Sequence, residues 1–145
     1  MCGRLNVSDD PFVAQLLSEL GVDNTSGSMH YGRFVRATNT LSIVREISAN
    51  EASVRTVNNG NTKKRRVLTS AIWWLLLEPT DTGFRPSKYT SFNTRYDKLD
   101  VPRSAGYQAY RESRCVIVAK GFGETEFKNK KPLHYHDFEA DQGAI

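Results

Sequence analysis

Two apolar stretches decide the fold of this chain: LSIVREI at residues 41–47 and VLTSAIWWLLL at residues 67–77. Between them lies NNGN at residues 58–61, whose residue types favour the positive φ angles of a tight turn. A further strand pattern covers residues 53–57, so the chain is predicted to return from residue 67 as one side of a hairpin. The basic run at residues 63–66 then lies near the hairpin tip.

The second apolar stretch ends in the run Ala71–Leu77, which has the length of a buried strand. Apolar residues 114–119 predict another strand, and they place Cys115 in the core. Alternating side chains over residues 131–138 are typical of a half-exposed strand. Residues 79–88 are predicted to form a loop.

A helix is predicted near the start of the chain. Asp10 and the residues before it provide a capping side chain, and Pro11 suits the first helical turn. The apolar residues that follow share one helical face, and Gly21 ends the pattern. A second, shorter helical segment is expected within residues 104–112.

Strand patterns therefore outnumber helical ones, and the chain contains no internal repeat or linker. We predict an α+β fold of curled, mostly antiparallel, hairpin-built sheets, barrel-like around one core, with a few short helices. Residues 1–145 form a single domain in this interpretation.

The composition indicates a cytoplasmic protein. Hydrophobic residues make up 39% and charged residues 25% of the chain, and the mean hydropathy is −0.52. No run approaches the roughly 18 apolar residues of a membrane span, and no secretory signal precedes the domain. Two cysteines suit a reducing compartment. A net charge of +4 and a pI of about 9.2 favour an anionic partner.

Cys2 carries the most distinctive chemistry. Its small side chain permits removal of Met1, which leaves an α-amine and a thiol on adjacent carbons. Both groups are partly nucleophilic near neutral pH. With an aldehyde, the amine forms an imine and the thiolate then closes a five-membered thiazolidine. An internal cysteine such as Cys115 cannot react in this way. The alternative is that Cys2 is an incidental residue at a chain end.

Other polar residues suggest binding or proton transfer. Asn93 and Arg95, two residues apart in an extended segment, would point the same way and suit a phosphate or sugar ligand. Glu124 follows the predicted strand 114–119 in a glycine-broken turn, where a carboxylate could relay protons. Two cysteines with His134 and His136 lack the paired spacing of a structural zinc site, so no metal is expected.

In this order along the chain, several segments resemble the SOS response-associated peptidase (SRAP) family. They are MCGR at residues 1–4, NTR at residues 93–95, RCVIVAKGFGE at residues 114–124, and the stretch 131–145. The resemblance spans nearly the whole chain, and its opening tetrapeptide is its most specific part.

The resemblance implies binding to single-stranded DNA and covalent shielding of abasic sites through their ring-opened aldehyde. By match, Cys2 is the nucleophile, Asn93 and Arg95 position the DNA and the lesion, and Glu124 manages protons. Arg4, in the matched opening segment, is expected to bind DNA. The resemblance implies no metal and no organic cofactor, and a location near the nucleoid.

The chain also departs from the family pattern. Gly123 and Thr125 stand where the family has an aromatic residue before its Glu and a Trp after it. Family domains continue past the position of Ile145, so we expect a C-terminally short member, or one completed by a second copy or another chain. Two alternatives remain open: a degenerate single-stranded DNA-binding module without chemistry, and a self-processing cysteine peptidase acting on protein.

Overall fold

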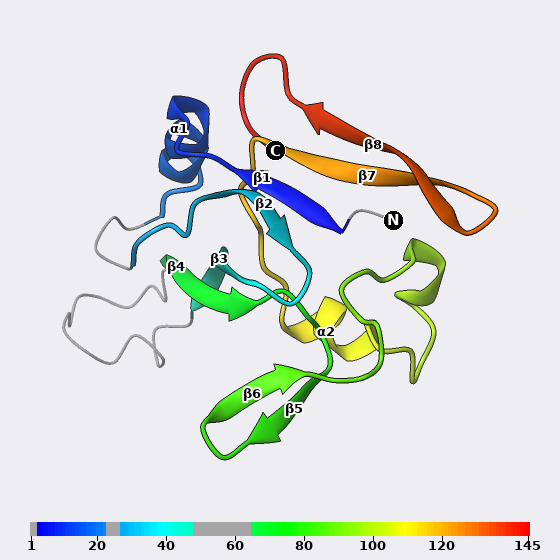
Figure 1. Cartoon of the computed structure of the whole chain (residues 1–145). Coiled ribbons are helices and arrows are strands. Elements are labelled where there is room, and N and C mark those ends of the chain that lie inside the picture. The colour runs from blue at the N-terminus through cyan, green and yellow to red at the C-terminus, as the bar shows by residue number, and fades with distance from the viewer. Residues whose placement is uncertain (1–2, 23–26, 48–64) are drawn as a thin grey trace, which may run out of the picture.

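The computed structural model describes residues 3–22, 27–47 and 65–145. The predicted strand at 53–57, the turn at 58–61 and Lys63–Lys64 lie outside these residues. Eleven elements are described, in chain order (Figure 1): β1 Arg4–Val7, α1 Pro11–Glu19, β2 Gly32–Arg36, β3 Thr40–Ile47, β4 Arg65–Ile72, β5 Leu77–Thr80, β6 Gly83–Pro86, the 3₁₀ helix η1 Tyr96–Lys98, α2 Tyr107–Glu112, β7 Gly121–Lys128 and β8 Lys131–Glu139.

The α+β class with mostly antiparallel sheets and few short helices is confirmed. One sheet has four strands in the order β2-β1-β7-β8, and two further sheets are the hairpins β3-β4 and β5-β6. The expectation of curled, barrel-like sheets is wrong: over the described residues each sheet is open. A barrel needs a continuous ladder of strands. Here a single antiparallel bridge, between Val44 and Val116, joins β3 to the segment that leads into β7.

The strand predicted from residue 67 is present as β4, and its partner is β3; the partner predicted for it, residues 53–57, lies outside the described residues. β3 and β4 pair antiparallel from Thr40 opposite Ile72 to Ile47 opposite Arg65. The predicted continuation of the buried strand to Leu77 is wrong, because β4 ends at Ile72 and the chain bends before β5 begins. The predicted loop at 79–88 is also wrong, since most of it lies in the β5–β6 hairpin. The turn at residues 81–82, followed by Gly83 at a φ of 147°, closes that hairpin.

The helix prediction is confirmed. The side chain of Asp10 accepts a hydrogen bond from the backbone N–H of Phe12 at 2.8 Å, and Pro11 opens α1. Gly21, just past the helix, has a φ of 65°, which glycine adopts without strain. Val13, on the apolar face of α1, is fully buried. A buried side chain of this size stabilises the fold by about 1.5–3 kcal/mol.

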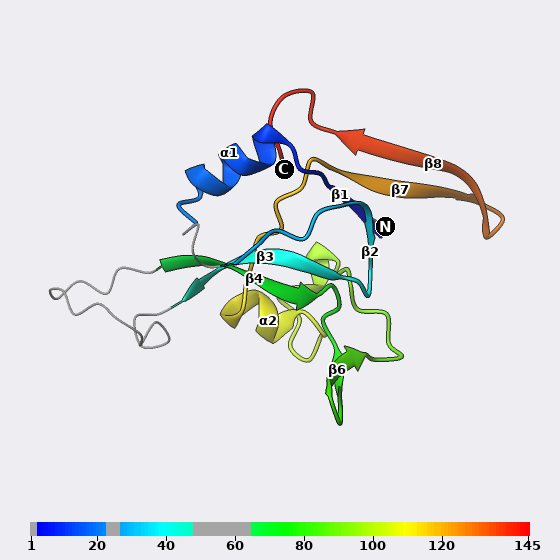
Figure 2. The ribbon, with the colours of Figure 1, turned by 60° about the vertical axis from the view of Figure 1, so that its left-hand side comes forward.

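The core consists of two adjoining clusters of buried side chains. Val7 and Leu41 are the largest fully buried side chains of one cluster, and Val13 and Val118 are those of the other. Figure 2 shows α1 above the β3–β4 hairpin, with the segment leading into β7 passing between them. Residues from that segment, Val118 and Ala119, join both clusters together.

Residues 117–119 are therefore apolar because they cross the core, whereas residues 114–116 are exposed. The predicted strand at 114–119 is wrong. Two isolated residue pairs stand in place of a ladder: Val116 with Val44, through backbone hydrogen bonds of 2.8 and 2.9 Å, and Ala119 with Ile145, through two of 2.7 Å. Cys115, predicted in the core, is exposed. The strand begins later, at Gly121, and it places Glu124 within β7 instead of in a turn.

The strand predicted at 131–138 is confirmed as β8. It pairs with β7 in a hairpin that reaches away from the rest of the molecule in both Figure 1 and Figure 2. Every residue of β8 is exposed, so the strand is more open to solvent than the half-exposed strand predicted from its alternation.

Candidate functional site

The start of the chain enters the middle of the four-stranded sheet. Cys2 lies outside the described residues, and Gly3 is the first that the structure describes. The carbonyl of Gly3 accepts a hydrogen bond of 3.3 Å from the N–H of Ala37, and β1 begins at the next residue. Strands on both sides of β1 therefore hold the residue that follows Cys2.

Glu124 lies beside this chain start. In the β1–β7 ladder, Asn6 pairs with Gly121, Leu5 with Phe122 and Arg4 with Gly123. One further step of the same antiparallel register brings Gly3 opposite Glu124. The Glu124 side chain is half-buried. The register thus places the Glu124 carboxylate next to Gly3, which is the first described residue and directly follows Cys2.

The segment at residues 91–95 lies at the same end of β1, and three of its residues fasten it. Ser91 is buried, and its hydroxyl and carbonyl oxygens accept hydrogen bonds from the N–H groups of Leu76 at 2.9 Å and Leu75 at 3.2 Å. Phe92 lies so close to Gly3 that a Cβ added there would be 3.7 Å from its ring. Thr94 packs against Gly106, where an added Cβ would clash with it at 2.7 Å.

Phe92 also completes an aromatic cluster with both tryptophans. Its ring meets Trp73 edge-on at 6.2 Å between centroids and lies tilted against Trp74 at 5.6 Å. Such pairs stabilise the fold by about 0.5–1.5 kcal/mol beyond the area that they bury. The cluster therefore fixes the backbone on which Asn93 stands.

Asn93 and Arg95 are both exposed. They belong to no strand, and η1 follows directly at Tyr96. Arg95 makes a bidentate ion pair with Asp97, with both N–O distances 3.0 Å, and its side chain is 77% exposed. A pair this exposed is worth little in water, so the guanidinium can exchange its partner for another anion.

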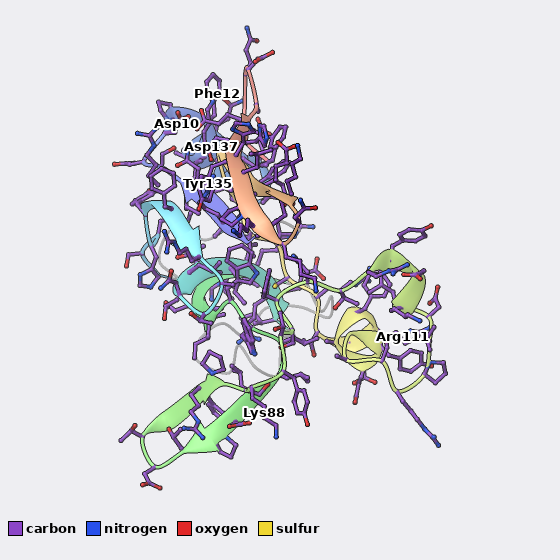
Figure 3. All side chains as sticks on the ribbon, turned by 45° about the vertical axis from the view of Figure 1, so that its right-hand side comes forward. Asp10, Phe12, Lys88, Arg111, Tyr135 and Asp137 are labelled. Carbon is purple, nitrogen blue, oxygen red and sulfur yellow. The ribbon has the colours of Figure 1, made fainter. Side chains whose placement is uncertain are left out.

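Arg4 is held on the other face of the sheet from Glu124. Its Nη2 donates to Oδ1 of Asp137 at 2.8 Å, and only 19% of its side chain is exposed. Its guanidinium also lies 5.3 Å from the Phe34 ring centroid and 5.6 Å from that of Tyr135. Figure 3 shows Tyr135 and Asp137 close together along β8.

This position of Arg4 accounts for Gly123. The two residues are paired in register, and a Cβ at Gly123 would overlap the Arg4 guanidinium, with 2.6 Å to Nη2. An aromatic side chain at position 123 would occupy the same space. The departure from the expected aromatic residue therefore has a steric reason.

A family model described as SOS response associated peptidase (SRAP) matches residues 1–144. The chain belongs to the SRAP family. Comparison with curated proteins and with solved structures gave no match. The family description associates the chain with the SOS response and with a peptidase family.

The structure brings some of the predicted SRAP site residues together. Gly3 lies opposite Glu124 in the continued β1–β7 register and against Phe92, the neighbour of Asn93, whereas Arg95 pairs with Asp97. Sequence reasoning missed Ser91, whose role depends on its burial against the bend at 75–76. It also missed the Asp137 carboxylate as the partner of Arg4, 133 positions away.

A cavity of about 630 Å³ in this SRAP chain lies elsewhere, between α2, β3 and the start of β4. Arginines 45, 66, 111 and 114 line it together with Cys115, and none of the predicted site residues does. The surrounding protein desolvates the Cys115 thiol and raises its pKa above the ordinary value, so its thiolate form is disfavoured. This thiol is a poor nucleophile, and the cavity is separate from the site at the chain start.

His134 and His136 lie on β8 with their rings 6.1 Å apart, and His136 contacts Glu126 at 3.2 Å. Among residues 3–22, 27–47 and 65–145, no group of three or more His, Cys, Asp or Glu side chains is arranged to hold a metal ion. No helix within these ranges combines the length and the apolar character needed to cross a membrane.

Proposed function

We propose that this SRAP domain captures abasic sites in single-stranded DNA by forming a thiazolidine crosslink through Cys2 after removal of Met1. The observation that carries the proposal is the position of Gly3, the residue that directly follows Cys2 in the chain. Gly3 lies opposite Glu124 in the continued β1–β7 register and against the ring of Phe92. The family match, which begins at residue 1, supports the same assignment.

The reaction needs no oxidant and no cofactor. The α-amine of Cys2 adds to the aldehyde of the ring-opened abasic sugar and expels one water to form an imine. The Cys2 thiolate then adds to the imine carbon, the C=N electron pair moves to nitrogen, and that nitrogen takes up a proton. Two bonds, C–N and C–S, hold the DNA to the protein, so the lifetime of the complex does not depend on non-covalent affinity.

Glu124 is proposed as the proton carrier. A half-buried carboxylate beside the chain start can accept a proton from the α-ammonium group, because only the free amine attacks the aldehyde. The same carboxyl group can return a proton to the ring nitrogen at closure. Asn93 is proposed to orient the opened sugar, since its amide both donates and accepts hydrogen bonds.

Two arginines are proposed to bind the DNA backbone. Arg95 is 77% exposed and can release Asp97 to pair with a phosphate. Arg4 is proposed to contribute its positive charge from its place beside Asp137. Recognition of this kind is independent of sequence, as an abasic site requires, because the missing base offers nothing to read.

The family description names a peptidase, and the Cys2 thiolate could serve as its nucleophile as well as in the crosslink. A thiolate at Cys2 is positioned in sequence to attack the peptide bond that precedes it. We propose that the peptidase activity is removal of residues ahead of Cys2. An extension of a few residues placed before Cys2 is expected to be cleaved, and an extension that stays intact on purified protein would count against this use.

The crosslink is tested with a 5′-labelled abasic oligonucleotide and protein whose intact mass shows loss of Met1. We expect a shifted band that survives denaturing electrophoresis in the unmodified chain and in Cys115→Ala, and loss of that band in Cys2→Ala. Cys115→Ala is the matched control, because it removes the other thiol of the chain.

Glu124→Gln is expected to slow crosslinking by about 10²-fold or more, the size of a typical general acid–base contribution. Asn93→Ala is expected to slow it as well, because the opened sugar loses its hydrogen-bonding partner. A matched substitution outside the site is Glu126→Gln, which lies two residues further along β7. Equal crosslinking by Cys2→Ala and the unmodified chain would refute the proposal. Equal rates for Glu124→Gln and Glu126→Gln would remove Glu124 from it.

A further inference from the structure

The hairpin of β7 and β8 carries a cluster of positive charge at its turn. Residues 128–131 read KNKK, so three lysines, which we call the lysine tip, lie within four positions. All three are exposed, and in the described part of the chain none of them makes an ion pair. Figures 1 and 2 show the turn projecting far from the rest of the fold. The lysine tip therefore presents uncompensated charge to solvent.

The turn holds one of these lysines in an unfavourable conformation. Asn129 and Lys130 have φ angles of 51° and 64°, as in the two-residue turns that favour Asn followed by Gly. Asn tolerates this region, whereas Lys at the second position is strained by its Cβ. Glycine would serve the fold better at residue 130. A lysine there suggests that the charge has a use outside folding.

Aromatic side chains connect the lysine tip to the start of the chain. Phe127 is 63% exposed and Tyr135 is 66% exposed. Tyr135 pairs with Thr125, and alternation along β7 puts Phe127 on the same face as Thr125. Tyr135 in turn lies 5.6 Å from the Arg4 guanidinium. One face of the hairpin therefore carries, in order outward from β1, Arg4, Tyr135 and Phe127. The lysine tip lies at the outer end of this row, where Lys128 pairs with Lys131 on the other face.

We propose that the β7–β8 hairpin is an arm that binds the undamaged single-stranded DNA next to the lesion. The lysine tip contacts phosphates, and the rings of Tyr135 and Phe127 stack on unpaired bases. The choice of partner rests on the function proposed above. From Gly123, opposite Arg4, to Lys128 the arm spans five residues, roughly 17 Å at about 3.4 Å per residue. That length is enough to contact several nucleotides of a single strand.

Single-stranded DNA fits this surface better than duplex DNA or an acidic protein does. Exposed rings can stack only on bases that are not already paired, and stacking on aromatic side chains is tolerant of sequence. Lysines supply charge without demanding a fixed partner geometry. An arm of this kind would add affinity on one side of the lesion and leave the reaction at Cys2 unchanged.

The test measures non-covalent binding of full-length Cys2→Ala protein to a labelled, undamaged 20-nucleotide single strand by fluorescence anisotropy. Replacing Lys128, Lys130 and Lys131 together by Gln should weaken binding about tenfold or more at low salt. Each phosphate contact contributes roughly 0.7 to the slope of log affinity against log salt. Loss of three contacts should therefore make that slope shallower by about 2. Phe127→Ala and Tyr135→Ala should each weaken binding about fivefold or more. Lys88→Gln, on an exposed residue next to β6, is the matched control and should change neither quantity.

Lys130→Gly separates a binding role from a folding role. It removes one charge and relieves the strained φ, so we expect weaker DNA binding together with an equal or higher melting temperature. Unchanged affinity in the triple lysine variant would overturn the proposal, as would equal losses for a duplex of the same length. The readout uses no lesion. Failure of the crosslinking reaction would therefore refute only the function proposed for Cys2, and failure of these variants would refute only the arm.

Discussion

The contact between Arg4 and Gly123 leads to a quantitative prediction. Gly123→Ala should destabilise the domain, because the new Cβ would occupy the place of the Arg4 guanidinium. The Arg4 side chain would have to move and give up its bond to Asp137 and its ring contacts with Phe34 and Tyr135. The same substitution in an Arg4→Ala background should stabilise the domain, because nothing then opposes the added methyl group.

The magnitudes follow from the exposure of the groups involved. Asp137 is 52% exposed, so solvent screening limits its ion pair with Arg4 to about 1 kcal/mol. Each cation–π contact adds about 0.5–1 kcal/mol at such a site. Alanine in place of glycine in a strand returns about 0.5–1 kcal/mol. Gly123→Ala should therefore lower the free energy of unfolding by about 1–2 kcal/mol. In the Arg4→Ala background it should raise it by about 0.5–1 kcal/mol.

The assay is a double-mutant cycle of urea unfolding followed by far-UV circular dichroism, with the four proteins compared at equal concentration. The expected coupling between the two positions is about 1.5–3 kcal/mol. Gly121→Ala is the matched control on the same strand. Its Cβ would overlap the backbone carbonyl oxygen of Phe138, so removing the Arg4 side chain cannot relieve it. Its cost, about 1–3 kcal/mol or more, should be the same in both backgrounds.

A Gly123→Ala effect that is equal in the two backgrounds would refute this reasoning. It would mean that the Arg4 side chain does not occupy the space above Gly123 in solution. Coupling of the expected size at Gly121 as well would show that Arg4 supports the whole sheet instead of the single position opposite it.

Two further predictions concern side chains at the site and at the separate cavity. Ser91→Ala leaves the N–H of Leu76 without its 2.9 Å acceptor, so the free energy of unfolding should fall by about 1–3 kcal/mol. The rate of crosslinking should fall as well. Ser113→Ala, at an exposed serine, is the control and should change neither the stability nor the rate. Cys115 is exposed at the cavity, but the protein atoms around its thiol partly desolvate it and raise its pKa. Its thiolate fraction at pH 8 is therefore below that of a free thiol, and the fraction rises as the pH approaches the raised pKa. Peptide mapping of Cys2→Ala protein should show alkylation of Cys115 by iodoacetamide slower than that of glutathione, and urea should remove the difference; equal rates in the folded protein would contradict the shift.

Elements with local causes could be predicted from the sequence. The start of α1 depends on Asp10 and Pro11, which are adjacent, and β3 and β8 follow from alternation within a few residues. The chemistry proposed for Cys2 is equally local, because the α-amine and the thiol belong to one residue. The order of the matching segments along the chain indicates the SRAP family without any structural contact, and the family model confirms it.

Contacts between distant residues decided the rest. Residues 114–119 have the composition of a strand, but Val118 and Ala119 are buried because this part of the segment crosses between two clusters, and composition alone cannot distinguish the two cases. Glycine at position 123 is explained by the Arg4 side chain opposite it. Asn93 is positioned by its neighbours Ser91, Phe92 and Thr94, which contact residues far away in the chain. Side-chain chemistry is a property of each residue. Its position relative to other groups depends on which distant surfaces pack together, and only the tertiary structure determines that.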